Sequence, residues 1–213
     1  MSKISKSELT KSKILHSAEA LFMEKGYNNV TVREIAANAK LSHTTIYLYY
    51  KDKEQLLNEI ALLPLLDFRK VVAETFEQFA KEPRQLINEL GKQLVYFGIT
   101  NRTMYDVYFN QGSVNVQMKE PSLEVNQIRN ELFEYITKSF ALLFPMKSME
   151  DLTTYARMFY FFSNGLITSY VNNTEETKAI IDRITPIMEE MYAILLSGIE
   201  HYGNEEVHDG KTN

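Results

Sequence analysis

The segment 30–53 constrains the fold of this chain more than any other part of the sequence. Thr31 and Glu34 have the spacing of a capping box, in which the threonine hydroxyl accepts a hydrogen bond from the glutamate amide and the glutamate accepts one from the threonine amide. This pattern predicts a helix that begins at Val32. Ser42 is a favourable N-cap for a further helix of about two turns, and a tight turn would join the two. The segment is therefore predicted to form a helix-turn-helix.

Apolar residues at helical spacing predict one helix before this segment and another after it. The earlier helix is predicted to end at Gly26, where a glycine C-cap is wanted. Asp52 repeats the capping pattern and predicts the start of a fourth helix. The apolar face of the earlier helix is predicted to hold Ile14, Leu15, Ala18, Leu21 and Phe22.

The third predicted helix has one buried face and one exposed face. Ile46 and Tyr50 fall on the same side as Leu41, which predicts that they face the core. The outer side then carries hydroxyl, methyl, imidazole and phenol groups, which suit base edges and phosphates. Because the first residues of such a helix normally point into the major groove, the segment is predicted to bind DNA. The candidate DNA-binding residues are Thr31, Arg33, Ser42, His43, Thr44, Tyr47, Leu48, Lys51 and Lys53.

Two kinds of contact are predicted within this set. His43 and Thr44 are placed to read base edges. An alternative for Tyr47 is a half-buried position in the core, which is common for tyrosine in small domains. The residues placed to hold phosphates without reading sequence are Thr31, Tyr47, Lys51 and Lys53.

Over residues 10–57 the sequence resembles the TetR family of bacterial transcriptional repressors. The resemblance is carried by Ile14-Leu15-x-x-Ala18-x-x-Leu21-Phe22-x-x-x-Gly26-Tyr27, by Thr31-Val32-x-x-Ile35-Ala36, and by Leu41-Ser42-x-x-Thr45-Ile46-Tyr47-x-x-Tyr50-Lys51-Asp52-Lys53-Glu54-x-Leu56. Beyond residue 57 the resemblance is architectural only. It implies a DNA-binding unit followed by a helical region that dimerises and binds small molecules.

Three positions depart from the family pattern. Lys40 and Thr44 stand where the family commonly has glycine, and Tyr50 stands where it frequently has phenylalanine. A lysine at a positive φ would cost about 1 kcal/mol relative to glycine, which is tolerable. The side chain of Thr44 either reads bases or crowds the groove, so the operator of relatives cannot be transferred to this chain.

The charges are unevenly distributed along the chain. Residues 1–53 hold 9 Lys+Arg against 5 Asp+Glu, a net +4, and residues 54–213 hold 14 against 23, a net -9. A basic beginning followed by an acidic remainder indicates that only the first part meets phosphate. Chance clustering is the alternative at an imbalance of this size.

Composition excludes several classes of site. The chain has no cysteine, so it forms neither a disulfide framework nor a thiolate zinc site. Its first residues lack an apolar signal core, and no uncharged apolar run approaches the roughly 20 residues of a membrane span. A cytoplasmic protein without a membrane partner is expected.

The 213 residues are predicted to form an all-α fold with little β-type alternation. Three regions are expected: a three-helix helix-turn-helix DNA-binding domain over residues 1–52, a larger helical effector-binding and dimerisation domain over 53–203, and a polar tail over 204–213. Pro64 is expected to kink the fourth helix or to split it. The last helix either continues from Glu176 or begins afresh at Thr185, because Pro186 lies within it.

The family resemblance implies a homodimer in which the last two long helices pair with their copies. The first of them contains the run 158–162, Met-Phe-Tyr-Phe-Phe, which is apolar over more than one helical face. Intrachain burial accounts for only one such face, and broad exposed apolar patches mark interfaces. A two-turn recognition helix touches one half-site, so two copies would read a palindrome.

The middle of the chain is rich in aromatic residues, and the resemblance implies a small-molecule site among these helices. An aromatic cavity with a few polar groups is the usual form of such a site. Ordinary core packing is the alternative for each residue taken singly. Arg102 and Asp106 are further polar candidates. The candidate ligand-binding residues are Tyr96, Phe97, Asn101, Tyr105, Tyr108, Phe109, Phe133, Phe161 and Asn164.

Together these features predict a repressor that binds a palindromic operator in double-stranded DNA as a homodimer. A small hydrophobic effector would release it, with the fourth helix acting as a lever. The alternative is a TetR-like helical protein that acts mainly through protein contacts and has weak or vestigial DNA binding. Lys40 and Thr44 leave that alternative open.

An enzyme is not expected. The four histidines show no metal or triad spacing, and there is no cysteine nucleophile and no glycine-rich phosphate loop. Accordingly no catalytic residue, no metal ligand and no cofactor is predicted.

Overall fold

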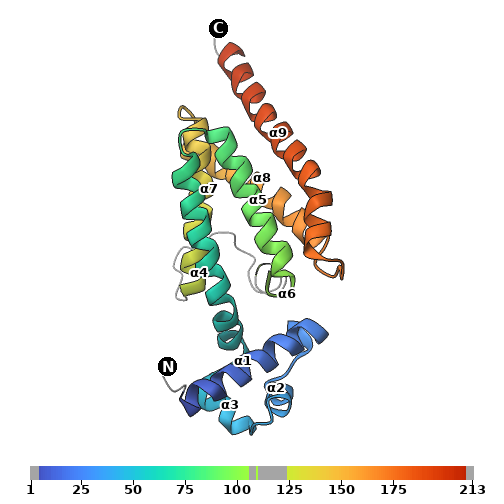
Figure 1. Cartoon of the computed structure of the whole chain (residues 1–213). Coiled ribbons are helices and arrows are strands. Elements are labelled where there is room, and N and C mark those ends of the chain that lie inside the picture. The colour runs from blue at the N-terminus through green and yellow to red at the C-terminus, as the bar shows by residue number, and fades with distance from the viewer. Residues whose placement is uncertain (1–4, 106–108, 110–123, 210–213) are drawn as a thin grey trace. The chain divides into compact units, whose positions relative to one another are not determined.

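The structure is a computed structural model that describes residues 5–105, 109 and 124–209. Over these residues the chain is helical and contains no strand, which confirms the predicted all-α fold. The elements are α1 (Lys6–Lys25), the short 3-10 helix η1 (Tyr27–Asn29), α2 (Val32–Asn38), α3 (His43–Tyr49), α4 (Lys53–Phe79), α5 (Pro83–Thr100), α6 (Arg102–Tyr105), α7 (Glu124–Leu143), α8 (Met149–Thr168) and α9 (Thr177–Asp209), as Figure 1 shows.

The described residues divide into two compact units. The first unit holds 5–67, 103–105, 109 and 124–128, and the second unit holds 68–102 and 129–209. Helices α4 and α7 each contribute residues to both units. The predicted domain limits at residues 52 and 203 stay a prediction.

In the first unit, α2 packs on both α1 and α3. Figure 1 shows these helices gathered around the beginning of α4. The predicted apolar face of α1 is buried apart from Leu15, and the small Ala36 allows α2 to approach closely. The core of this unit is formed by Ile14, Ala18, Leu21, Phe22, Ile35, Ala36, Ile46, Tyr50, Leu56, Leu57 and Ala61. A small apolar core therefore fixes the helix-turn-helix.

Both internal prolines lie within unbroken helices. Helix α4 runs through Pro64, so the alternative of a split there is wrong, and α9 runs through Pro186 without a fresh start. Proline removes one backbone hydrogen bond, but the helix continues where its neighbours are well packed. Ala61 and Leu65 are fully buried around the first proline, as is Ile184 beside the second.

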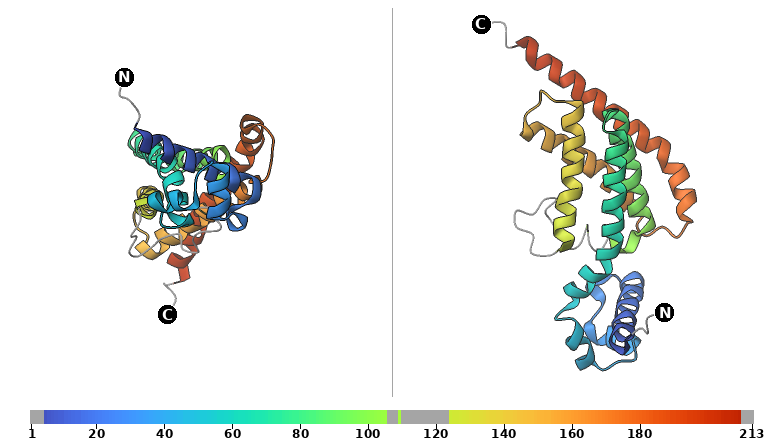
Figure 2. Two further views of the ribbon diagram at one scale, coloured as in Figure 1. Left: turned by 90° about the horizontal axis from the view of Figure 1, so that it is seen from below. Right: turned by 60° about the vertical axis from the view of Figure 1, so that its left-hand side comes forward.

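The second unit is held together by close helix crossings. Helix α5 contacts both α8 and α9, and the right view of Figure 2 shows α9 passing beside α5. A Cβ built on Gly91 would lie 2.1 Å from the ring of Tyr192, and one on Gly98 would lie 2.6 Å from Ile167. Only glycine fits at these two crossings. Buried hydroxyls of Ser163 and Tyr192, 2.7 Å apart, add a polar contact between α8 and α9.

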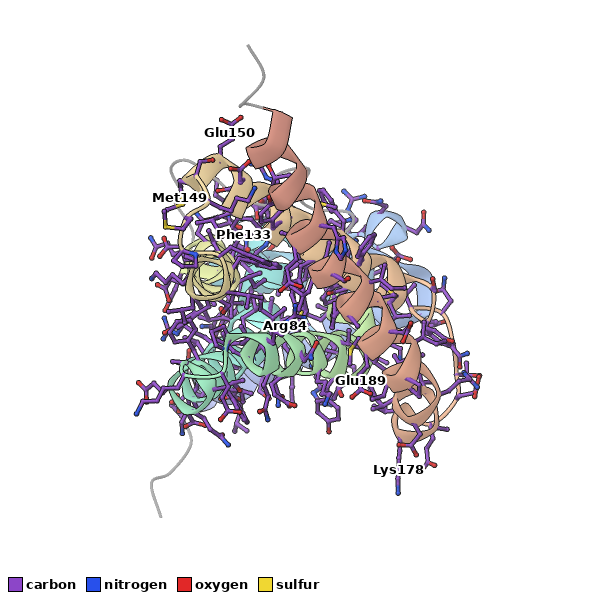
Figure 3. The ribbon with its side chains drawn as sticks, turned by 90° about the horizontal axis from the view of Figure 1, so that it is seen from above. Arg84, Phe133, Met149, Glu150, Lys178 and Glu189 are labelled. Atoms are coloured by element: carbon purple, nitrogen blue, oxygen red, sulfur yellow. The ribbon has the colours of Figure 1, made fainter. Side chains whose placement is uncertain are left out.

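Ion pairs cross the outer side of the same helices. Lys92 on α5 pairs with Glu189 on α9 at 3.1 Å, and Arg84 pairs with Glu200. Figure 3 labels Arg84 and Glu189 on these two helices. Helix α9 continues to Asp209, whereas the sequence placed the start of a polar tail at residue 204. Within the described part of the chain, no helix combines the length and apolarity needed to cross a bilayer.

Candidate nucleic-acid interface

Helix α2 begins with the predicted capping box. The Thr31 hydroxyl accepts from the Glu34 amide at 3.2 Å, and the Thr31 amide donates to the Glu34 carboxylate at 2.9 Å. The Lys25 ammonium donates to the same carboxylate at 2.9 Å. The bond from Lys25, followed by those from Thr31, lowers the pKa of Glu34 to about 2. Glu34 is therefore held as an anion that ties α1 to the beginning of α2.

The turn between α2 and α3 is tight and uses a left-handed residue. Lys40 has a φ of 56°, the positive value anticipated at this position. The Leu41 amide donates to the Ala36 carbonyl at 2.9 Å, which closes the turn. The Cβ of a lysine is strained at this φ, which costs some free energy. The cost is modest because the rest of the side chain lies in solvent.

Helix α3 is anchored from one side only. Ser42 is its N-cap and accepts from the Thr45 amide at 3.0 Å. Ile46 is fully buried and Tyr50 is 1% exposed, so both face the core as predicted. These contacts fix the helix axis and its rotation.

The opposite face of α3 is open to solvent. Leu48 is 78% and Tyr47 49% exposed, and His43 and Thr44 are exposed as well. The His43 ring meets the Tyr47 ring edge to face, with centroids 4.8 Å apart. The half-buried alternative for Tyr47 therefore fits less well than the outward position. This exposed set, His43, Thr44, Tyr47 and Leu48, is called the α3 face below.

The remaining DNA-binding candidates differ in their surroundings. Thr31, Arg33, Ser42 and Lys51 are exposed, and the Lys51 amide donates to the Gln55 side chain at 2.8 Å in the cap of α4. Lys53 is different. Its ammonium donates to the carbonyls of Tyr27 at 2.6 Å and Val30 at 2.9 Å, and it is partly buried.

The ligand-binding candidates differ in how far they are buried. In the second unit, Phe97 and Phe133 are buried, and Phe97 stacks on Phe68 with centroids 4.3 Å apart. Phe133 is labelled in Figure 3. By contrast, Tyr96 is 54% and Phe161 56% exposed, so neither lines an enclosed cavity of this unit. Helical spacing alone did not separate these outward residues from the inward ones, because their helices are apolar on more than one side.

The remaining ligand-binding candidates are two asparagines of the second unit and three aromatic residues near the end of α6. The Asn101 side chain donates to the Phe97 carbonyl at 2.9 Å, and Asn164 is partly exposed on α8. In the first unit, Tyr105 is fully buried and stacks on Phe109 at 4.5 Å. Tyr108 and Asp106 lie outside the described residues.

Tyr96 instead lines an open groove between α5 and α9 of about 360 Å³. The other residues around this groove are Glu89, Lys92, Gln93, Val95, Ile181, Thr185 and Met188. Sequence reasoning missed the contribution of α9 to this groove, because no local pattern indicates which face of α9 meets α5. Sequence reasoning also missed that Arg102 links α6 to the segment between α8 and α9. The Arg102 guanidinium donates to the backbone carbonyls of Asn173 and Glu175.

Residues 14–60 match the family model described as bacterial regulatory proteins, tetR family. The match covers α2, α3 and the beginning of α4, so this region resembles the DNA-binding domain of the TetR family. Among curated proteins, the chain is 46% identical over 44 residues to the uncharacterized HTH-type transcriptional regulator YuxN of Bacillus subtilis (strain 168). The match covers 21% of this chain and 15% of that protein. The chain is 38% identical over 79 residues to the HTH-type transcriptional regulator HbdR of Aromatoleum sp. (strain CIB), covering 37% of this chain and 30% of that one. The matched part thus spans less than a third of either relative.

Solved structures extend the likeness to the whole fold. A bacterial regulatory protein in the tetR family from Rhodococcus RHA1 has a TM-score of 0.64 at 20% identity, covering 88% of this chain and 97% of that chain. The transcriptional regulator FadR from Bacillus subtilis, solved in complex with stearoyl-CoA, has a TM-score of 0.57 at 17% identity, covering 85% and 96%. At these identities the likeness concerns the fold alone.

Proposed function

We propose that this chain is a TetR-family transcriptional repressor that binds a palindromic operator as a homodimer and leaves it when a small hydrophobic effector binds. The observation that carries the proposal is the α3 face, an outward set of polar and apolar groups on a helix whose other side is buried. Such groups can hydrogen-bond to base edges and contact thymine methyls in the major groove. The exposed Arg33 and Lys51 are available for phosphates on either side.

The proposed dimer uses exposed apolar surface on α8 and α9. Met158, Phe161 and Phe162 on α8 are 40%, 56% and 42% exposed, and Ile187 and Ile194 on α9 are 51% and 63% exposed. Apart from its chain neighbours and its own helix backbone, a Cβ on Gly165 of α8 or on Gly198 of α9 would meet no atom of the described residues within 4 Å. Apolar side chains beside open glycines suit close helix packing against a second copy. Two copies would place their recognition helices about 34–36 Å apart on the operator.

The proposed effector acts through α4. This helix begins at Lys53 and carries Phe68, which stacks on the buried Phe97 of α5. An effector that displaces Phe97 would therefore disturb α4. To shift operator occupancy from 99:1 to 1:99, it must prefer the released state by about 10⁴-fold. Stearoyl-CoA, the ligand of the Bacillus subtilis FadR structure, is a reasonable first probe of this class.

Fluorescence anisotropy with labelled DNA from upstream of the chain's own gene tests the DNA-binding part. We expect specific binding that His43→Ala makes less selective among operator variants, because base contacts carry the sequence preference. Lys51→Ala should weaken binding to every sequence and reduce the slope of log affinity against log salt by about one. Wild-type behaviour of both variants on a bound operator would contradict the docking of α3, and no specific binding would contradict the proposal.

Sedimentation equilibrium tests the dimer. We expect a dimer for the wild-type chain and a monomer for Phe161→Glu, because a carboxylate buried in an apolar interface loses its hydration without a partner. Glu150→Gln, on the exposed first turn of α8, serves as the matched control and should remain dimeric. A monomeric wild-type chain would overturn the homodimer.

A further inference from the structure

Lys53 is the first residue of α4, and its side chain points back to the loop before α2. Its ammonium donates to the Tyr27 carbonyl at 2.6 Å and to the Val30 carbonyl at 2.9 Å. It also lies over the Tyr27 ring, 4.1 Å from the centroid. One side chain thus joins the beginning of α4 to both ends of the segment 27–30.

The chemistry of this contact suits a lysine. An ammonium has three donors and no acceptor, and two donors are occupied by the carbonyls. The face of the Tyr27 ring carries the negative part of its quadrupole and stabilises the cation further. Burial lowers the pKa of Lys53, in keeping with an ammonium that has left bulk water. Most of the binding capacity of Lys53 is therefore used inside the protein.

The loop that Lys53 holds leads directly into the recognition hairpin. Val30 is buried and precedes Thr31, the N-cap of α2. The Tyr27 ring also packs edge to face on Phe22 of α1, with centroids 5.2 Å apart. A change in the position of the Lys53 ammonium would thus reach α1 and the beginning of α2 without passing through α3.

From this geometry we infer that Lys53 is a positioning residue, which fixes the start of α4 to the 27–30 segment and so sets the orientation of the recognition hairpin. Its ammonium is assigned to this joint rather than to a phosphate. The part of the inference that concerns operator binding rests on the proposed function. The part that concerns the joint between α4 and the loop does not.

The stability of the free protein tests the joint without DNA. Lys53→Met retains the aliphatic stem but loses the ammonium, and we expect its Tm to fall by about 4 °C, because bonds to a charged donor are lost. Lys51→Met is the matched control, since Lys51 is an exposed lysine two positions earlier, and its Tm should change by less than about 1 °C. Equal Tm values for the two variants would overturn the inference.

A second pair of variants tests the same joint without altering any charge. Tyr27→Leu removes the ring beneath the ammonium and should lower the Tm, whereas Tyr27→Phe keeps the ring and should preserve it. In the double variant Lys53→Met/Tyr27→Leu the Tm loss should be smaller than the sum of the two single losses, because the residues share one interaction. Additive losses would argue against the joint.

The salt dependence of operator binding separates positioning from phosphate contact. A phosphate ligand contributes about 0.9 to the slope of log affinity against log salt. We expect Lys51→Met to reduce the slope by about that amount, and Lys53→Met to lower affinity about fivefold at every salt concentration with the slope unchanged. A reduced slope for Lys53→Met with an unchanged Tm would establish Lys53 as a phosphate ligand. If the wild-type chain binds no operator, the proposed function fails while the Tm measurements still decide the joint.

Discussion

The two units of this protein stabilise their helices in different ways. In the first unit α2 and α3 are 7 residues long, and each begins with a side-chain cap, from Thr31 and Ser42 respectively. In the second unit the 18-residue α5 crosses α9 where Gly91 meets Tyr192, and it crosses the 20-residue α8 where Gly98 meets Ile167. Short helices gain little from internal hydrogen bonds, so caps and a few buried side chains decide whether they form. Long helices form readily, and their packing decides how they are arranged.

This difference suits the function proposed for each unit. A recognition helix held by one cap and a small core has its outer face free for DNA. A helical unit held by close crossings transmits a displacement of one helix to its neighbours, because packed interiors resist partial deformation. Substitutions that act on caps and on crossings should therefore have different consequences.

The largest effect is expected for Gly91→Ala in the second unit. Its new Cβ would lie 2.1 Å from the buried Tyr192 ring, so the ring or the helices must shift to admit it. The free energy of unfolding should fall by about 3 kcal/mol, measured by urea denaturation. Gln85→Ala is the control, because Gln85 is exposed on the same helix and the substitution should change stability by less than about 1 kcal/mol. A small effect of Gly91→Ala would show that the crossing is adaptable.

Removal of the α3 cap should lower stability by a smaller amount and should also weaken DNA binding. Ser42→Ala loses the acceptor for the Thr45 amide and should cost about 1 kcal/mol. Ser148→Ala removes the equivalent cap of α8 and should cost a similar amount. We expect only Ser42→Ala to weaken DNA binding as well, and Ser42→Thr to retain it. Equal DNA affinity for the two alanine variants would show that α3 does not depend on its cap.

Lys40→Gly should stabilise the protein slightly. The residue has a φ of 56°, and replacement by glycine removes the Cβ strain, with an expected gain of about 0.5–1 kcal/mol in the free energy of unfolding. Lys40→Ala keeps the Cβ and should show no gain. If both variants gain equally, loss of the lysine charge rather than relief of strain is responsible.

The smallest effect on stability is expected for replacement of the anion Glu34, and the size of this effect depends on pH. Because the folded protein lowers the pKa of Glu34 to about 2 from an ordinary value of 4.5, its contribution is complete above about pH 4.5 and is lost as the pH falls toward 2. The Tm difference between wild type and Glu34→Gln should be largest at pH 7 and should vanish near pH 2. A constant difference across this range would contradict the role of the Lys25 and Thr31 bonds.

The first unit was predictable from sequence because its signals are local. The caps at Thr31 and Ser42, the glycine at position 26 and the outward α3 face each depend on residues only a few positions apart. Lys53 was the exception. Its partners Tyr27 and Val30 lie more than twenty positions earlier, so only the fold brings them together.

In the second unit, helical spacing predicted the helices but not what they contact. The same spacing fits the buried Phe97 and the exposed Tyr96 and Phe161, because apolar residues occur on more than one side of these helices. Pro64 and Pro186 illustrate the same limit, since their neighbours are buried and the helices continue through both.

The amino-acid sequence by itself determined that the chain is helical, where its short helices begin, and which face of the third helix meets solvent. Those properties follow from hydrogen bonds and spacings within one or two helical turns. The tertiary structure alone decided that Tyr192 lies against Gly91 and that the Lys53 ammonium is directed inward. Such contacts join residues that are distant in the chain, and their partners are chosen by the packing of the whole unit.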